Sequence, residues 1–163
     1  MKHFIISLAA ILLFASVSFA QSKDSADRCE VVNNKVGALI SQYKTLRDKR
    51  RQLPPGIYDR DLSADGGKLS KVLSSLGAEL GRLPYTKQNI VDCLGHPDAI
   101  KNHKQMGNFL DLYHRELKKA GRKVEKEGNR EYLIYFWRGW HDFLFFISED
   151  GAIVDHGWWF AYE

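Results

Sequence analysis

The chain has 163 residues, of which 44% are hydrophobic and 27% are charged, and its formal net charge is +4. This length suits one domain with a substantial core, and no internal repeat or low-complexity segment interrupts the sequence. The basic residues alternate with acidic ones, as in KKAGRKVEKEG, which indicates a solvated helix face and argues against a nucleic-acid surface. A polyanionic partner, such as an acidic glycan or a membrane surface, is an alternative for this mild positive charge.

Residues 1–20 have the pattern of a secretory signal peptide. Lys2 supplies the positive start, and residues 4–17 form an apolar stretch that is too short for a comfortable membrane span. Small residues precede the expected cleavage point after Ala20, and the nearest cysteine, Cys29, lies too far along to carry a lipid anchor. We therefore expect a secreted or periplasmic chain with no stable membrane insertion after cleavage; an uncleaved anchor is the alternative.

A long amphipathic helix is predicted over residues 24–52, within an N-terminal segment that spans residues 21–56. Its apolar residues recur at alternating steps of three and four, which is typical of a narrow seam that packs along another helix. The seam consists of Cys29, Val32, Val36, Leu39, Tyr43 and Leu46. Two prolines and a glycine follow at 54–56 and end the helix. Residues 57–163 are then expected to form an α+β domain that opens with a polar, exposed loop.

Three more helices are predicted, over residues 68–80, 86–94 and 103–126. The first and third have apolar residues at helical spacing along one face. The second begins at Thr86, a favourable N-cap, and ends at Gly95, where a left-handed backbone conformation is expected.

The two cysteines, Cys29 and Cys93, fall on the inward faces of their predicted helices. An even cysteine count in an exported chain favours one disulfide bond, because thiols oxidise outside the cytosol. Two separate buried thiols are the alternative. Two cysteines are too few for a zinc site, and we expect neither a metal nor a cofactor.

Three strands are predicted at the C-terminus, over residues 131–137, 141–148 and 152–161. A tight turn at 138–139 joins the first pair, and Asp150-Gly151, a dipeptide suited to a two-residue hairpin, joins the second. Helices that precede a run of strands indicate the α+β class. The expected architecture is a set of N-terminal helices packed on one face of a C-terminal three-stranded antiparallel β-meander.

Two-residue turns would place Tyr135 opposite Asp142 and Asp142 opposite Trp159, and this pairing divides the aromatic residues between two faces of the sheet. We assign the more continuously apolar face, with Phe143 and Phe145, to the core beneath the helices. The other face mixes aromatic and polar side chains, and exposed aromatic residues at this density are typical of a binding surface. The predicted partner-binding residues are Tyr135, Trp137, Trp140, Asp142 and Trp159.

Two alternatives remain for this aromatic face. The first helix or a second copy of the chain could cover it, which would make the residues core or dimer contacts. A small-ligand site is the other alternative.

The stretches YTKQNIVDCLGHPDAI, YLIYFWRG and DFLFFISEDGAIVDHGWW resemble the SmpA/OmlA and β-lactamase-inhibitor-protein type of exported small domain. The resemblance covers about residues 65–163, and it rests on a short helix with a Gly-x-Pro end and a meander with an Asp-Gly turn. The matching residues are Thr86, Ile90, Leu94, Gly95, Pro97, Asp98, Tyr135, Phe145, Asp150, Gly151 and Val154. It implies a helix pair on a three-stranded sheet and a role in binding other envelope proteins. The chain departs from the pattern in its long first helix, in residues 101–130, and in having no lipid-anchor cysteine.

We therefore expect an exported, non-catalytic module that binds a protein partner, or itself, through the aromatic sheet face. A small-ligand or lipid-binding domain is one alternative. A hydrolase or metal enzyme that uses His141 and His156 is another, although the predicted pairing separates these two residues by about 13 Å along the strands. No phosphate-binding loop, nucleophile elbow or zinc-binding helix motif is present in the sequence.

Overall fold

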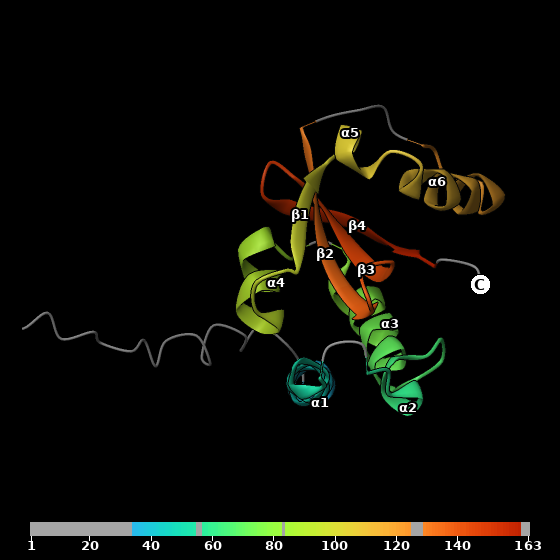
Figure 1. Cartoon of the computed structure of the whole chain (residues 1–163). Coiled ribbons are helices and arrows are strands. Elements are labelled where there is room, and N and C mark those ends of the chain that lie inside the picture. Colours follow the sequence, from blue (N-terminus) through green and yellow to red (C-terminus); the bar gives the residue numbers. More distant parts are fainter. Residues whose placement is uncertain (1–33, 55–56, 83, 125–128, 161–163) are drawn as a thin grey trace, which may run out of the picture.

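The computed structural model describes residues 34–54, 57–82, 84–124 and 129–160. Figure 1 shows the sheet between two groups of helices, with α1 to α4 on one side and α5 and α6 on the other. The helices are α1 (Asn34–Gln52), α2 (Arg60–Ser63), α3 (Lys68–Leu80), α4 (Lys87–Leu94), α5 (His103–Met106) and α6 (Phe109–Lys119). The strands are β1 (Ala99–Asn102), β2 (Arg130–Arg138), β3 (Asp142–Glu149) and β4 (Ala152–Trp159).

The sheet is antiparallel, with the strand order β1-β2-β3-β4. The α+β class and the antiparallel sheet at the C-terminus are confirmed, but the prediction of three strands was wrong. The missed strand, β1, has only four residues and lies directly after the α4 turn. It pairs with the outer edge of β2, from Ala99 opposite Ile134 to Asn102 opposite Glu131.

One face of the sheet shares a hydrophobic core with α1, α2, α3 and α4. Leu69, Leu73 and Leu76 of α3 are buried in this core, which also takes in residues of β2, β3 and β4. The strand residues buried in it are Leu133, Tyr135, Trp137, Leu144, Phe146 and Ile153. This is the face that the predicted pairing left open for a partner, so the prediction of an uncovered face was wrong.

The opposite face shares a second core with α5 and α6. Met106 and Leu110 from these helices are buried there, and the strand residues in it are Tyr132, Ile134, Phe143, Phe145 and Ile147. Helices therefore cover both faces of the sheet, and the prediction of helices on one face was incomplete. The predicted single helix over 103–126 is also divided, because Gly107 has φ 48° and ψ −129°, a conformation that interrupts the helix and favours glycine.

The pairing of β2 with β3 differs from the prediction by two residues. Tyr135 lies opposite Leu144 and not opposite Asp142, because the connection between the strands is longer than a two-residue turn. A slip of two residues leaves each side chain on its predicted face. The connection from β3 to β4 is the expected tight turn, with positive φ at Asp150 (49°) and Gly151 (85°).

A bulge in β4 changes the faces of the residues that follow it. Ser148 pairs with Ile153, and the next β3 residue, Ile147, pairs with Asp155, so that Val154 is an extra residue in β4. Beyond the bulge, each β4 side chain lies on the opposite face from the one that uninterrupted alternation predicts.

The predicted signal peptide and the start of the first helix lie outside the described residues. Within the described part of the chain, α1 ends at Gln52, as predicted, and no helix is both long and apolar enough to cross a membrane.

Cys93 lies on the inward side of α4 with 2% of its surface exposed, and it is not a free thiol. Its predicted partner, Cys29, lies outside the described residues, so their pairing stays a prediction. We expect the purified, unreduced chain to be lighter than its reduced form by the two hydrogen atoms that oxidation of a thiol pair removes. Mass spectrometry before and after reduction measures this difference, and equal masses would contradict the bridge.

Candidate functional site

The five residues predicted to bind a partner do not form one surface. Tyr135 and Trp137 are fully buried, and Asp142 is 1% exposed. Trp159 lies beyond the β4 bulge, on the α5–α6 face, where it is partly buried. Trp140, in the turn between β2 and β3, is 77% exposed and is the one member of the set that is largely exposed. The prediction of a contiguous exposed aromatic site was therefore wrong.

Asp142 helps to stabilise the β2–β3 hairpin. Its Oδ2 atom forms an ion pair with Arg138 Nε at 2.7 Å, and its Oδ1 atom lies 3.3 Å from His141 Nδ1. These contacts are local to the turn and Asp142 is buried, so its placement does not support its predicted role in binding a partner.

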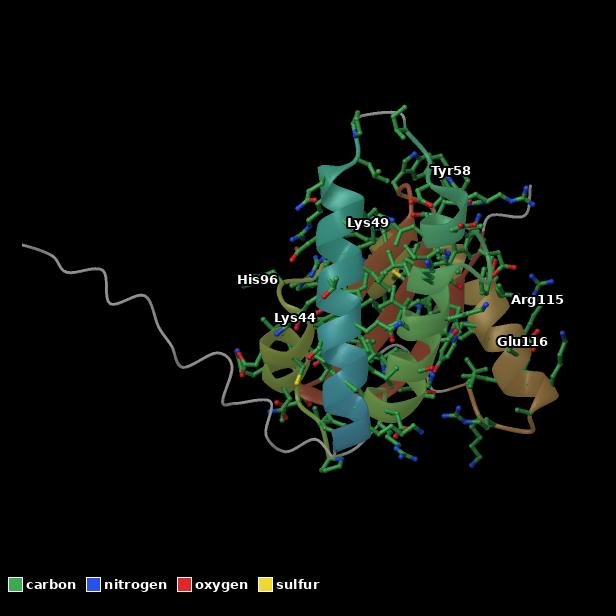
Figure 2. The ribbon with its side chains drawn as sticks, turned by 90° about the horizontal axis from the view of Figure 1, so that it is seen from below. Lys44, Lys49, Tyr58, His96, Arg115 and Glu116 are labelled. Atoms are coloured by element: carbon green, nitrogen blue, oxygen red, sulfur yellow. The ribbon has the colours of Figure 1, made fainter. Side chains whose placement is uncertain are left out.

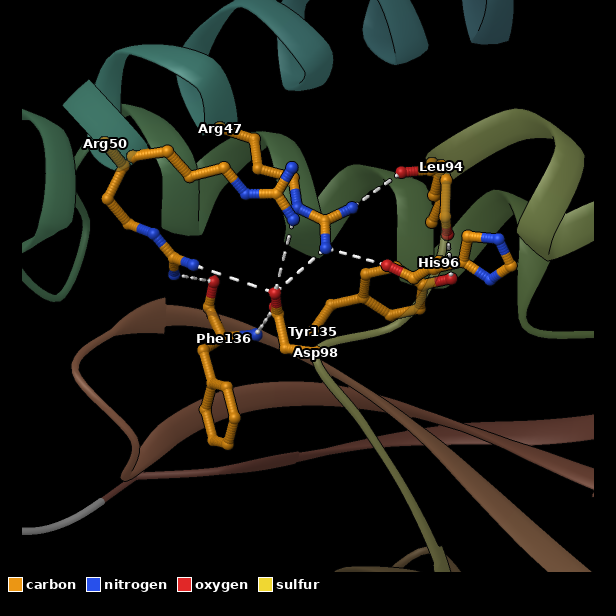
Figure 3. A network of polar contacts seen from close by, with 9 residues as sticks. Arg47, Arg50, Leu94, His96, Asp98, Tyr135 and Phe136 are labelled. Carbon is orange, nitrogen blue, oxygen red and sulfur yellow. Dashed lines mark hydrogen bonds and ion pairs between the residues drawn. The ribbon is translucent and has the colours of Figure 1, made fainter.

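A buried arginine network joins α1 to the segment between α4 and β2. Arg47 donates to the carbonyl oxygens of Leu94 at 3.0 Å and His96 at 2.7 Å, and to Asp98 Oδ1 at 2.9 Å. Figure 3 shows Arg47 and Arg50 converging on Asp98. The sequence gives no distinct signal for this role, because basic residues near the end of a helix also suit the helix dipole.

The network extends into the aromatic core. The Arg47 guanidinium lies 5.7 Å from the ring centres of both Tyr43 and Tyr135, within the range of cation–π interactions. The Tyr135 hydroxyl donates to the Gly95 carbonyl at 2.9 Å, and burial raises the pKa of that hydroxyl. Tyr135 is therefore a structural residue that fixes the α4–β1 turn.

A groove of about 530 Å³ lies between α6 and β4 and is the strongest candidate for a binding site; we call it the α6–β4 groove. Its volume falls within the usual range of ligand sites. Figure 2 shows α6, with Arg115 and Glu116 labelled, on the other side of the molecule from Lys44 of α1. The apolar lining comes from both elements and from the residue after β4: Leu112, Leu117, Ala120, Trp158 and Phe160.

Asp155 is the centre of the polar side of this groove. Its Oδ2 atom accepts a hydrogen bond from the Tyr113 hydroxyl at 2.7 Å and forms an ion pair with Arg122 at 2.6 Å. Its Oδ1 atom accepts the backbone N–H of His156 at 2.9 Å. Burial, together with the hydrogen bond to Asp155, raises the pKa of Tyr113, which keeps the phenol protonated.

His156 lies at the margin of the groove, against the C-terminal part of α3. A Cβ atom at Gly81 would lie 2.2 Å from His156 Nδ1 and would clash with the imidazole, and one at Gly77 would lie 2.9 Å from its Cδ2 and would force the neighbouring side chains to shift. His156 pairs with Phe146, whereas His141 precedes the first residue of β3. The two histidines are thus far apart, and among the described residues no group of three metal-ligating side chains is placed to hold an ion.

We expect His156 to make the protein less stable in acid. Burial lowers the pKa of His156, against the opposing effect of Asp155. The unfolded state, with a histidine pKa of about 6.5, therefore binds the proton first, and the free energy of unfolding falls as the pH drops from that value through the lower folded-state pKa. Urea unfolding at several pH values should show a shallower dependence for His156→Gln than for the wild-type chain. Equal slopes would contradict this assignment.

Comparison with protein-family models, curated proteins and solved structures finds no match to this chain. The resemblance to the SmpA/OmlA and β-lactamase-inhibitor-protein type stays a prediction.

Proposed function

We propose that this chain is an exported, non-catalytic module that binds a protein partner, and that the α6–β4 groove is its binding site. The observation that carries the proposal is the groove itself, which combines an apolar lining with a polar side centred on Asp155. Aromatic residues that are partly exposed beside such a lining are typical of protein-binding sites, and Trp158 and Phe160 supply them here.

The polar groups of the groove suit recognition better than catalysis. A general base needs a free acceptor within hydrogen-bond reach of the proton that it removes. Asp155 already accepts from Tyr113, Arg122 and the backbone of His156. The raised pKa of Tyr113 opposes its use as a nucleophile. The hydrolase or metal enzyme that uses His141 and His156 gains no support from their separate positions.

Export is part of the proposal because of the N-terminal sequence, where a positive start, an apolar stretch and small residues precede Ala20. The protein-binding role also agrees with the role that the family resemblance implies. A small-ligand or lipid-binding function is the second candidate, and the volume of the groove favours it equally. The two candidates differ in whether a macromolecule lies against the groove.

Site-specific photo-crosslinking tests this proposal. We would place p-benzoylphenylalanine at Leu112, which lines the groove, and at Lys44 as the control, because Lys44 is exposed on the far side of the molecule. Irradiation of cells that express each full chain should give a discrete protein adduct only from position 112. We expect Ala120→Trp to abolish this adduct by filling the groove. No adduct at 112, or the same adducts from both positions, would contradict the proposal.

A further inference from the structure

β4 is an edge strand, and its two halves differ in what lies beside them. The first half is covered, because Ile153 N–H donates to the Tyr85 carbonyl and Lys87 N–H donates to the Gly151 carbonyl, both at 2.8 Å. The second half, from His156 to the end of the strand, receives no backbone hydrogen bond from any described element other than β3. An uncovered edge of this kind is a template for another extended chain.

The geometry of the hairpin decides which backbone groups point away from β3. The pair that closes a two-residue turn, Glu149 with Ala152, exchanges hydrogen bonds, and such pairs then alternate along the strands. With the bulge counted, His156 and Trp158 fall at positions whose backbone groups face outward. The hydrogen bond from His156 N–H to the Asp155 side chain agrees with this orientation. Trp158 therefore presents both its N–H and its carbonyl to the open edge.

The α6–β4 groove runs beside these same residues. Its lining includes His156, Gly157 and Trp158 of β4 together with Leu112, Leu117 and Ala120 of α6. A chain that paired with Trp158 would lie along the groove, and alternate side chains would point towards α6. The apolar lining would receive those side chains, and the outward backbone groups would fix the direction of the chain.

A second copy of this chain fits the same edge poorly. Antiparallel pairing of β4 with β4 of a copy needs a two-fold axis perpendicular to the sheet, which keeps equivalent faces on the same side. That operation brings α6 of the copy to the side that α6 already occupies as a wall of the groove. A slim extended segment needs no space for a second helix.

We infer that the α6–β4 groove binds an extended peptide segment of a partner protein, which adds to the sheet as a strand beside β4 and pairs with the backbone of Trp158. This inference rests on the proposed function and specifies how the partner is held. Its apolar side chains would occupy the groove at every second position.

Peptide selection followed by backbone methylation tests the inference. The probe is a displayed library of random peptides about twelve residues long, which is selected for binding to the purified chain. We keep the peptides that still bind the Ala78→Trp variant and no longer bind the Ala120→Trp variant. Both alanines are exposed, but only Ala120 lines the groove, so the pair separates groove filling from a general effect of tryptophan. A selected peptide is then made with an N-methyl group at each backbone nitrogen in turn.

Strand addition predicts losses of affinity with a period of two. Methylation at alternate nitrogens should weaken binding about tenfold or more, methylation between them should have little effect, and the Trp158 amide should exchange with solvent more slowly in the complex. The inference is overturned by a helical period, by insensitivity to methylation, by the absence of any groove-dependent peptide, or by a dimer that already protects Trp158. Crosslinks from position 112 with peptides insensitive to methylation would overturn strand addition and leave the proposed function standing. Peptides that add as a strand, found together with an absence of crosslinks in cells, would support strand addition and contradict the proposed function.

Discussion

Replacing Arg47 by alanine is expected to lower the free energy of unfolding by about 3 kcal/mol. The side chain of Arg47 is 5% exposed and donates to two backbone carbonyls and to Asp98. Removing one partner of a buried ion pair costs about 3–5 kcal/mol, because the remaining groups lose their hydrogen bonds in a poorly hydrated site. We expect the lower end of this range, because Arg50 and Arg51 lie 3.9 and 3.8 Å from the same carboxylate and partly compensate its charge.

Arg51→Ala is the matched control for this measurement. This variant also removes an arginine side chain from α1, and the Arg51 guanidinium also faces the Asp98 carboxylate. The Arg51 side chain, however, is 56% exposed. Exposed ion pairs contribute up to about 1 kcal/mol. Urea unfolding of the two variants should therefore separate them clearly. Equal losses would show that the buried hydrogen bonds of Arg47 do not stabilise α1 against the rest of the fold.

Substitution of the four tryptophans should lower the free energy of unfolding by very different amounts, and we expect the largest loss for Trp137. It is fully buried, and its ring centre lies 5.6 Å from that of Trp158 and 5.3 Å from that of Phe160. Trp137→Ala removes these contacts and leaves a cavity, so we expect a loss of about 3–5 kcal/mol in the free energy of unfolding. Thermal or urea unfolding measures the change.

Trp140→Ala provides the control on the same hairpin. Because Trp140 is 77% exposed, we expect its removal to change the free energy of unfolding by no more than about 0.5 kcal/mol. Trp159→Ala should be more costly than Trp140→Ala, since the Trp159 ring packs edge-on against Phe109 at 4.8 Å. A large loss for Trp140, or a negligible loss for Trp137, would contradict the observed burial.

Elements with strong local signals could be predicted from the sequence. The apolar stripe of α3 defines its span, Lys68–Leu80, and Thr86 forms a capping box with Asn89 at the start of α4. Asp150-Gly151 makes the expected hairpin turn. In each case a few neighbouring residues carry the information, so no distant contact is needed to interpret them.

Elements that depend on distant partners could not be predicted in this way. The sequence of strand β1, AIKN, does not alternate between apolar and polar residues, and the strand is defined by its pairing with β2. The bulge at Val154 adds one residue without a change in composition, and it moves Trp159 away from the predicted cluster. The candidate site was missed for the same reason, because the α6–β4 groove exists only where α6 meets an edge strand more than thirty residues further along the chain.

The wide sequence separation within the arginine network also affects the order in which the protein assembles during synthesis. Arg50 donates to the carbonyl of Phe136, 86 residues further along the chain, and Arg47 needs carbonyls up to His96. At a synthesis rate of about 5–20 residues per second, α1 waits several seconds or longer for these acceptors to be made. The strands of the meander, by contrast, are neighbours in sequence and meet soon after they emerge. The contacts between α1 and β2 therefore form only after most of the chain has been made, although α1 is made before the other described elements.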